Sequence, residues 1–535
     1  MAARVCIVGA GPVGLSLALR LADFGIPAVI YDQNPGLKQE GSKACLIQGD
    51  VLEILDKSRC ASVVHAEGVP WACSNLYIGG EPMERTRHRL DNRYGPFVNI
   101  SQYRIEQIPL AELMRRPQLS VEWSSRVVAL EQKEGGVAVE IEREGQRVRR
   151  EYAYVVACNG QRSNLRDLVG ATWLGYRHSA QFLITDIKAR LPWAKERHFH
   201  FDPPFNRGYQ VIIHPQPDDV WRIDWQLPPG VDVEQERRDG GLERRIRAVI
   251  GEVDYTLEWL SAYRFQQRRV ERMLHGRVLF AGDAAHALPP YGSRGMNSGI
   301  QDADNLAWKL ALVMQGVADP LLLDTYHVER SAAAKENIEV TEKTLRFMVP
   351  SGPVARLRRR LLLALARRHR YFLRHVNHGT MARPHRYVES PLVQAPVTAP
   401  VVGCFAADVA LQMEGRRLQL RELLGRGFCF VYVGRQPPRA LPARLEAFGT
   451  LATAALVLSV DGPAPLPRSM LPGLQWARAD AAALAHYLPD HWHLVRPDMH
   501  VAGVYDFERP EQFDDALCDF LVAAYQTSEP LWLAA

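Results

Sequence analysis

The fold is decided by residues 5–14, which read Val-Cys-Ile-Val-Gly-Ala-Gly-Pro-Val-Gly. The apolar run at residues 5–8 predicts a buried strand, and Gly9, Gly11 and Gly14 follow it at GxGxxG spacing. The first such glycine makes a tight turn, the second lets the backbone approach a pyrophosphate, and the third lets a helix pack on the strand. That helix offers free amides and the positive end of its dipole to an anion. We therefore predict a phosphate-binding turn between a strand and a helix.

An acidic residue, Asp32, follows the next predicted strand. The apolar run at residues 28–31 predicts the next strand, and Asp32 comes directly after it. A carboxylate at this point accepts hydrogen bonds from both ribose hydroxyls and repels a 2′-phosphate. The start of the chain therefore predicts a βαβ unit for an adenine dinucleotide with a free ribose, which means FAD or NAD.

Composition narrows the class of protein. The chain has 535 residues, 47% of them hydrophobic, which predicts two or three domains. The formal net charge is only +5 and is spread along the chain, so we expect no nucleic-acid partner. The eight cysteines form no CxxC or metal-ligand spacing, which favours reduced thiols and no bound metal. Glycines interrupt the first apolar run far short of a signal or membrane span, so we expect a cytoplasmic protein without a membrane span.

The pattern changes to a period of two between about residues 180 and 227. Apolar residues at 221, 223, 225 and 227 alternate there with Arg222, Asp224 and Gln226. A strand with one polar and one apolar face belongs to a mixed or antiparallel sheet, so this part predicts a second domain. A short apolar strand at residues 277–280 and a long helix at residues 297–317 then predict that the first domain resumes.

The resumed part carries a longer motif. It reads Leu-Phe-Ala-Gly-Asp-Ala-Ala-His at residues 279–286 and Pro-Pro-Tyr-Gly-Ser-Arg-Gly-Met-Asn at residues 289–297. This motif resembles the second flavin fingerprint of the class A flavoprotein aromatic hydroxylases. The physical reading agrees, because Asp283 can accept a hydrogen bond from a ribityl hydroxyl and the backbone amides of residues 292–297 can lie against the flavin pyrimidine. The segment Arg-Pro-Asp-Met-His-Val-Ala at residues 496–502 resembles the C-terminal domain of their branch that contains phenol hydroxylase and 3-(3-hydroxyphenyl)propionate hydroxylase.

The resemblance implies an α/β fold and a reaction. It predicts a Rossmann-like FAD-binding domain (residues 1–175 and 265–385), interrupted by a mixed β-sheet substrate domain (residues 176–264) and followed by a C-terminal thioredoxin-like domain (residues 395–535). In this family NADH or NADPH reduces FAD, and the reduced flavin takes up O2 and hydroxylates a small phenolic ring through a C4a-hydroperoxyflavin. The expected partners are therefore an aromatic substrate and O2, with a homodimer as an open alternative for assembly. A reductase of the same fold that does not insert oxygen, and a binding protein that has lost flavin, are the competing hypotheses.

The motifs and the resemblance also assign residues to the cofactor. These are Gly9, Gly11, Pro12, Val13, Gly14, Asp32, Gln33, Lys43, Gln102, Gly282, Asp283, Pro289, Gly295, Met296 and Asn297. A surface polar residue is the alternative for Lys43 and Gln102. Asn159 stands where the family has an aspartate, so that segment keeps an acceptor oxygen but loses a charge.

Substrate-lining residues are expected on the polar strand face. Tyr209, Arg222 and Asp224 are the candidates, and a solvated face is the alternative reading. Arg222 either binds a substrate carboxylate or pairs with Asp224. The weak catalytic candidates are His214 and Pro290. His214 could act as a base near neutral pH. The resemblance implies that the Pro290 carbonyl points at a substrate hydroxyl.

The run of arginines and leucines at residues 356–370 has two readings. It predicts either a helix packed by Leu361, Leu362, Leu363 and Leu365 with solvated arginines, or a basic amphipathic helix at a membrane surface. We expect the packed helix.

Overall fold

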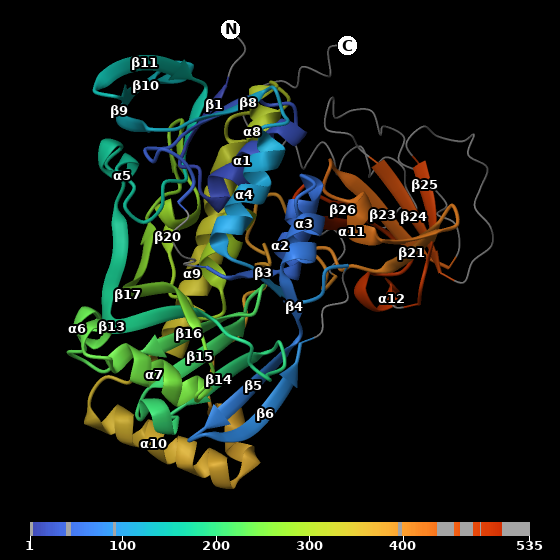
Figure 1. Ribbon diagram of the computed structural model, residues 1–535. Helices are drawn as coiled ribbons and strands as arrows, with labels where there is room; N and C mark the ends of the chain where they lie inside the picture. Colours follow the sequence, from blue (N-terminus) through green and yellow to red (C-terminus); the bar gives the residue numbers. More distant parts are fainter. Residues whose placement is uncertain are drawn as a thin grey trace, which may run out of the picture.

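The computed structural model describes residues 4–38, 44–88, 93–393, 399–435, 454–460, 474–481 and 483–505. Strands in this part form five sheets, and Figure 1 shows the two largest bodies stacked, with a third beside them. The fold is a mixed α/β fold, as expected from the sequence.

The first body is built on a six-stranded sheet in the order β18-β19-β12-β1-β2-β8. Its strands are β1 (Val5–Val8), β2 (Ala28–Tyr31), β8 (Leu119–Glu122), β12 (Tyr154–Ala157), β18 (Leu274–His275) and β19 (Val278–Phe280). All neighbours are parallel except β18 and β19. Strands buried on both faces read as continuous apolar runs, which is why residues 5–8 and 28–31 contain no polar residue except Tyr31 at its end.

Helices and two small sheets surround this core. The helices are α1 (Pro12–Asp23), α2 (Gly49–Lys57), α3 (Ala61–Glu67), α4 (Gln102–Leu113), α5 (Leu165–Leu168), α8 (Arg294–Met314) and α9 (Leu322–Met348). One small sheet joins β3 (Leu46–Gln48), β7 (Phe97–Asn99) and β4 (Val69–Trp71). The other is antiparallel and joins β9 (Ser125–Lys133), β10 (Gly136–Arg143) and β11 (Gln146–Tyr152). Helix α8 begins at Arg294, three residues before the predicted start. The last four residues of the motif at residues 279–297 therefore form the first turn of this helix.

The second body is an eight-stranded mixed sheet in the order β20-β17-β13-β16-β15-β14-β5-β6. Its strands are β5 (Cys73–Ile78), β6 (Glu81–Arg87), β13 (Trp173–Lys188), β14 (Arg197–Phe201), β15 (Gln210–Pro215), β16 (Val220–Gln226), β17 (Thr256–Val270) and β20 (His286–Ala287). The sheet therefore takes in residues 73–87, which lie outside the segment 176–264 that the sequence suggested. The long strands β13 and β17 run up from this sheet to the first body (Figure 1).

The two faces of this sheet have different neighbours. Trp221, Ile223 and Trp225 are fully buried in a core with α6 (Val233–Arg238) and α7 (Gly241–Ile250). The opposite face, which carries Arg222 and Gln226, is also buried, and its apolar members pack with α9 and α10 (Pro353–Arg368). The solvated alternative for the polar strand face is therefore wrong, because the alternation separates two buried environments.

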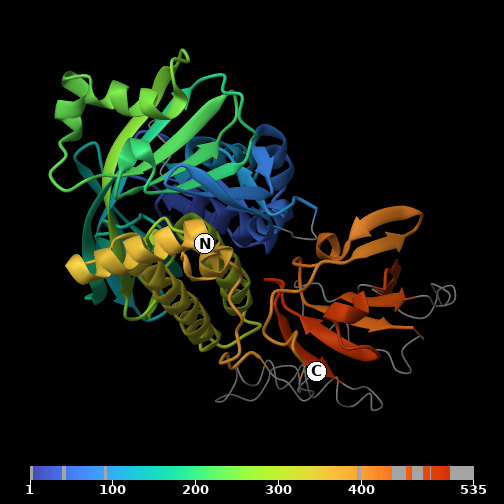
Figure 2. The same ribbon diagram turned by 90° about the horizontal axis from the view of Figure 1, so that it is seen from below.

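Helix α10 lies at the lower end of the molecule and crosses the foreground in the view from below (Figures 1 and 2). Arg359, Leu363 and Ala366 form its buried side at i, i+4 and i+7 spacing. The expectation that its leucines pack inward is wrong for Leu361 and Leu365, whose exposed fractions are 56% and 42%. These two residues lie on the opposite side of the helix from the buried row. Among the helices that the structure describes, none combines the length and the apolarity that a membrane crossing requires.

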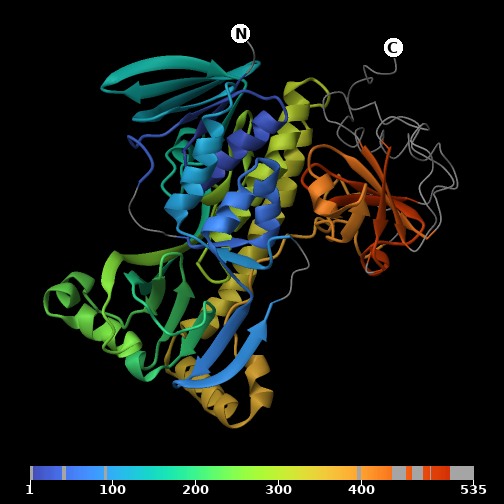
Figure 3. The ribbon, with the colours of Figure 1, turned by 45° about the vertical axis from the view of Figure 1, so that its right-hand side comes forward.

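The third body is a seven-stranded sheet in the order β22-β21-β25-β24-β23-β26-β27. Its elements are β21 (Ala410–Met413), β22 (Arg416–Gln419), β23 (Cys429–Gly434), β24 (Ala454–Val460), β25 (Leu474–Ala479), β26 (His491–Val495), β27 (Val501–Tyr505), α11 (Leu420–Leu423) and α12 (Ala483–His486). Figure 3 shows it beside the first body and away from the eight-stranded sheet. Buried ion pairs hold it there: Glu329 on α9 accepts hydrogen bonds from Arg496 at 2.5 and 2.9 Å and from Lys309 on α8 at 2.7 Å.

Candidate active site

The first glycine turn has the geometry expected of a phosphate site. Gly9 has φ +110°, and a Cβ there would lie 2.6 Å from the Cys158 carbonyl oxygen. A Cβ on Gly14 would lie 2.0 Å from the Gly9 oxygen, whereas one on Gly11 would meet no atom of the described residues within 4 Å. Within the part of the chain that the structure describes, no side chain caps the N-terminus of α1. The second glycine therefore faces open space beside an uncapped helix N-terminus, which suits an anionic group.

Asp32 closes this turn. Its Oδ2 accepts a hydrogen bond from the Ala10 amide at 2.8 Å, and its Oδ1 accepts one from the Asn34 amide at 2.8 Å. Each carboxylate oxygen can accept more than one hydrogen bond, so the group can also hold ribose hydroxyls. Gln33 is exposed. Lys43 lies outside the described residues.

Gln102 lies at the start of α4 and orders the segment before β3. Its Oε1 accepts a hydrogen bond from the Ala44 amide at 3.2 Å, and its Nε2 donates to Glu106 at 2.8 Å. The side chain therefore positions the chain at residues 44–48 beside the helix. Its contact with the cofactor stays a prediction.

The second motif packs directly on the first. A Cβ on Gly282, which has φ +60°, would lie 2.8 Å from Val13 Cγ2, and one on Gly299 would lie 2.6 Å from the same atom. Asp283 accepts a hydrogen bond from Gln161 Nε2 at 3.2 Å. Segments 9–14, 159–164 and 282–299 therefore converge at one place, although they are far apart in the sequence.

The side chain of Asn297 makes three hydrogen bonds to the protein. Its Oδ1 accepts from the Gln48 amide at 3.0 Å, and its Nδ2 donates to the carbonyls of Leu46 at 3.0 Å and Ser293 at 2.7 Å. Asn297 therefore ties β3 to the first turn of α8, and its backbone and the second lone pair of Oδ1 are left for a cofactor. Gly295 and Met296 precede it in that turn, where no side chain caps the helix.

The proline pair forms a turn. Pro289 is buried and Pro290 is exposed, and the Pro290 carbonyl accepts a hydrogen bond from the Ser293 amide at 3.0 Å. A carbonyl has a second lone pair, so the expected contact of Pro290 with a substrate hydroxyl stays a prediction.

A buried network behind the second motif was not expected from the sequence. Asp302 Oδ2 accepts from His286 Nε2 at 2.6 Å and from the Gly282 amide at 2.9 Å, and its Oδ1 accepts from Arg330 Nε at 2.6 Å. Burial alone would raise the pKa of Asp302, but His286 and Arg330 hold it below the usual value. His286 thus fixes the conformation of the motif. The partners are 16 and 28 residues apart, which no local pattern signals.

The inward face of the eight-stranded sheet presents a polar row. Asp186 on β13 lies directly opposite Arg222 on β16, and Arg222 lies opposite His214 on β15. The antiparallel register of β14 and β15 continues the row to Arg197, which pairs with Ser74 on β5. The sequence missed Arg197 and Asp186, although the alternation Arg-His-Phe-His-Phe at residues 197–201 was a signal for the first of them.

The register also decides the ion pairs. Arg222 donates to both carboxylate oxygens of Asp186 at 2.8 Å. Of the two alternatives for Arg222, the pairing with Asp224 is wrong, because Asp224 lies two residues along the same strand while Asp186 is the cross-strand neighbour. The buried Asp224 Oδ1 has no hydrogen-bond partner among the residues that the structure describes. Burial, partly offset by Arg222, raises the pKa of Asp224 to about 7.

His214 and Tyr209 lie in surroundings that the sequence did not predict. Burial, and then Arg197 and Arg222, lower the pKa of His214 well below its ordinary value, so the imidazole is a weaker base than expected and its catalytic role stays a prediction. A neutral imidazole remains, with its Nδ1 unpartnered. Tyr209 precedes β15 and is half-buried in a turn, so Gln210 takes the strand position instead. Gln210 Nε2 donates to the Tyr291 hydroxyl at 2.5 Å, which joins this face to the second motif.

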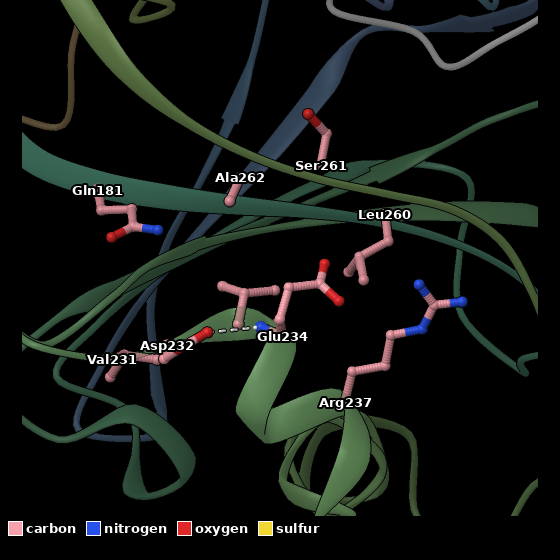
Figure 4. A pocket seen from close by; sticks show the side chains of 9 residues that line it. Gln181, Val231, Asp232, Glu234, Arg237, Leu260, Ser261 and Ala262 are labelled. Atoms are coloured by element: carbon pink, nitrogen blue, oxygen red, sulfur yellow. Dashed lines mark hydrogen bonds between the residues drawn. The ribbon is translucent and has the colours of Figure 1, made fainter.

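An open surface hollow of about 420 Å³ lies elsewhere, between α6 and the strands β13 and β17. Figure 4 shows its lining, in which Asp232 accepts a hydrogen bond from the Glu234 amide. None of its lining residues belongs to the two glycine motifs or to the polar row. The hollow is therefore separate from the motifs and from the polar row.

Comparisons with known proteins agree with this geometry. The FAD binding domain family matches residues 2–341. The 3-(3-hydroxy-phenyl)propionate/3-hydroxycinnamic acid hydroxylase 2 of Burkholderia vietnamiensis is 31% identical over 67% of this chain and 66% of its own length. The 6-methylpretetramide 4-monooxygenase of Streptomyces rimosus is 28% identical over 94% of this chain and 90% of its own length.

Solved structures show the same fold over nearly the whole chain. The flavin-dependent monooxygenase PieE, crystallised with FAD and substrate, has a TM-score of 0.80 at 21% identity and covers 98% of this chain and 99% of its own. The anhydrotetracycline hydroxylase OxyS from Streptomyces rimosus has a TM-score of 0.71 at 26% identity and covers 99% of this chain and 100% of its own.

Proposed function

The chain belongs to the FAD binding domain family, as an enzyme of the flavoprotein aromatic hydroxylase type, and from this premise we propose that it uses NADH or NADPH and O2 to hydroxylate a small phenolic substrate. The observation that carries the proposal is the buried polar face of the eight-stranded sheet, joined to the second glycine motif by the hydrogen bond between Gln210 and Tyr291. A polar face buried against a flavin motif is where an aromatic substrate with polar groups would be held.

The residues present fit FAD. Gly11 and the uncapped first turn of α1 would hold the pyrophosphate, and Asp32 would hold the ribose. Asp283 would accept from the ribityl chain, and the uncapped start of α8 would face the edge of the ring that gains negative charge on reduction. When bound, FAD supplies the redox and oxygen chemistry.

The chain's own task is to position and to shield. Phe182, Phe265 and Tyr291 form a buried aromatic group, with ring centroids 4.3 Å apart for the first two. Such a group can stack on a substrate ring and exclude water from it. We propose that the ring lies at this end of the sheet, beside the second motif, and that the polar row orients the rest of the substrate.

The test is coupled turnover. Purified enzyme would be supplied with NADH or NADPH and a panel of phenols, and O2 uptake, nucleotide oxidation and product would be measured together. We expect one phenol to stimulate nucleotide oxidation with hydroxylated product in near-equal yield. Oxidation that needs no O2 would support the reductase alternative, and a colourless protein that cannot be reconstituted with FAD would exclude both.

We propose three domains: an FAD-binding domain (residues 1–175 and 265–385), a substrate domain (residues 176–264) and a C-terminal domain (residues 395–535). Residues 73–87 are reassigned to the substrate domain, because they form two strands of its sheet. A thioredoxin-like C-terminal domain is supported by the run β25-β24-β23 of parallel strands, continued by antiparallel β26 and β27. The seven described cysteines are free thiols, which is typical of proteins in the cytoplasm, where we propose that this enzyme acts. A homodimer would be tested by light scattering.

A further inference from the structure

Arg197 is a buried cation without an anion. Its exposed fraction is 5%, its Nε has no hydrogen-bond partner in the described part of the chain, and its guanidinium carbon lies 5.4 Å from the centroid of the Phe199 ring. The other buried arginines of that part all have acceptors: Arg20, Arg166, Arg222, Arg294, Arg330, Arg359, Arg421 and Arg496. Arg197 is therefore an exception to the rule by which this protein buries guanidinium groups.

Neighbouring groups do not neutralise this charge. Burial lowers the pKa of Arg197 only to about 10, so the side chain stays charged at neutral pH. Arg222 is already matched by Asp186. Asp224 is close enough to influence Arg197, but the two form no ion pair. Burial, then the charge of Arg197, also lowers the pKa of His378.

Unpartnered hydrogen-bonding atoms lie on and just after the neighbouring strand β15. Among the described residues, His214 Nδ1 has no partner, and neither atom of the Gln216 side-chain amide has one. Both residues lie on β15 or directly after it, and alternate residues of a strand share a face. His214 is the cross-strand neighbour of Arg197 by continuation of the register. A buried cation with neutral hydrogen-bonding groups around it is a site built for an anion.

Resting on the proposed function, we propose that Arg197, with His214 and Gln216, binds the carboxylate of the aromatic substrate, so that the enzyme selects aromatic acids over neutral phenols. The aromatic end of the sheet lies at Phe201 and Gln210, four residues along β14 from Arg197. At about 3.3 Å per residue, the two ends are roughly 13 Å apart. The fitting substrate class is therefore an aromatic acid whose carboxylate is separated from the reacting ring by a side chain or by further rings.

The test is equilibrium binding to the FAD-loaded enzyme, read from the visible spectrum of the flavin. The probes are pairs of a hydroxylated aromatic acid and its carboxamide, with one, two and three rings, including 3-(3-hydroxyphenyl)propionate. We expect the acid of the best-fitting pair to bind about 10- to 100-fold more tightly than the amide, and this ratio to fall to about one in Arg197→Met. Arg190→Met, at a surface arginine beside the same sheet, should keep the ratio.

Equal binding of acid and amide in every pair, or a preference that survives in Arg197→Met, overturns the proposal. The pyrophosphate of NADH or NADPH is the other source of an anion. A raised KM for the nucleotide in Arg197→Met, with the acid preference unchanged, would assign the subsite to it and overturn the proposal. Acid binding through Arg197 without hydroxylated product would instead leave the subsite standing and refute the proposed function.

Stability separates an anion site from a structural role. Without ligand, Arg197→Met should unfold at the same or a higher temperature, because it removes an uncompensated buried charge. Arg222→Met should unfold at a lower temperature, since it leaves Asp186 without its partner. A fall in the unfolding temperature of Arg197→Met as large as that of Arg222→Met would mean that Arg197 is merely structural.

Discussion

Replacing Gly11 and Gly14 by alanine, one at a time, should separate cofactor binding from folding. A methyl group on Gly11 meets no protein atom within 4 Å, and Gly11 has an extended backbone with φ −77° that alanine also adopts. The apoprotein of Gly11→Ala should therefore keep its free energy of unfolding within about 1 kcal/mol. The same methyl group on Gly14 would lie 2.0 Å from the Gly9 oxygen, so Gly14→Ala should lose about 1–3 kcal/mol or more.

Gly11→Ala should nevertheless weaken FAD binding. The Gly11 methyl group would occupy the open space beside the first amides of α1 and hold the pyrophosphate away from them. Losing two charge-assisted hydrogen bonds costs about 3–6 kcal/mol, which weakens FAD binding about a hundred- to ten-thousand-fold. Apoprotein would be titrated with FAD by fluorescence quenching and unfolded by denaturant in parallel. FAD binding of Gly11→Ala within threefold of the wild type would refute this placement of the pyrophosphate.

Three further predictions concern buried charges. Asp302→Asn leaves the buried Arg330 without its anion and should lower the free energy of unfolding by about 3–5 kcal/mol, measured by denaturant titration; a loss below about 1 kcal/mol would contradict the network. Glu329→Gln should lower the free energy of unfolding by a similar amount, about 3–5 kcal/mol, and speed hydrogen exchange around Arg496. Unchanged exchange there would mean that this ion pair does not stabilise the third body. The pKa of Asp224 in the folded protein is raised to about 7, so its neutral form adds stability that is lost as the pH rises from about 4 to 7. Over that range the free energy of unfolding of the wild type should fall relative to Asp224→Asn by up to about 1.4 kcal/mol per pH unit, and above pH 7 the difference should stay constant. A difference between the two proteins that does not change with pH would refute the raised pKa.

The sequence predicted local features far better than pairings between distant segments. The strand at residues 5–8 and the roles of Gly9, Gly11 and Gly14 follow from neighbours within one turn, so a single stretch contains the information. The alternation around Arg222 likewise revealed two faces of one strand. Such patterns are set by backbone periodicity and do not depend on the partner.

What failed depended on register and on burial. Arg222 pairs with Asp186, 36 residues away, because strand pairing places them opposite each other. The lowered pKa of His214 comes from burial and from two arginines, Arg197 on β14 and Arg222 on β16, which lie on the two strands next to its own. Helix α10 was misread because both sides of it carry leucines, and only the rest of the fold decides which side is covered. Sequence periodicity does not carry that information.

The ion pairs between α9 and the third body bear on how the chain is made. Glu329 meets Arg496, which leaves the ribosome 167 residues later. At about 5–20 residues per second, that delay is roughly 8–33 s. During it, the nascent FAD-binding part presents Glu329, Lys309 and Asn305 where its final neighbour is still missing. These charged and polar groups can stay hydrated until the strand before Arg496 has been made, so the contact between the two bodies forms late.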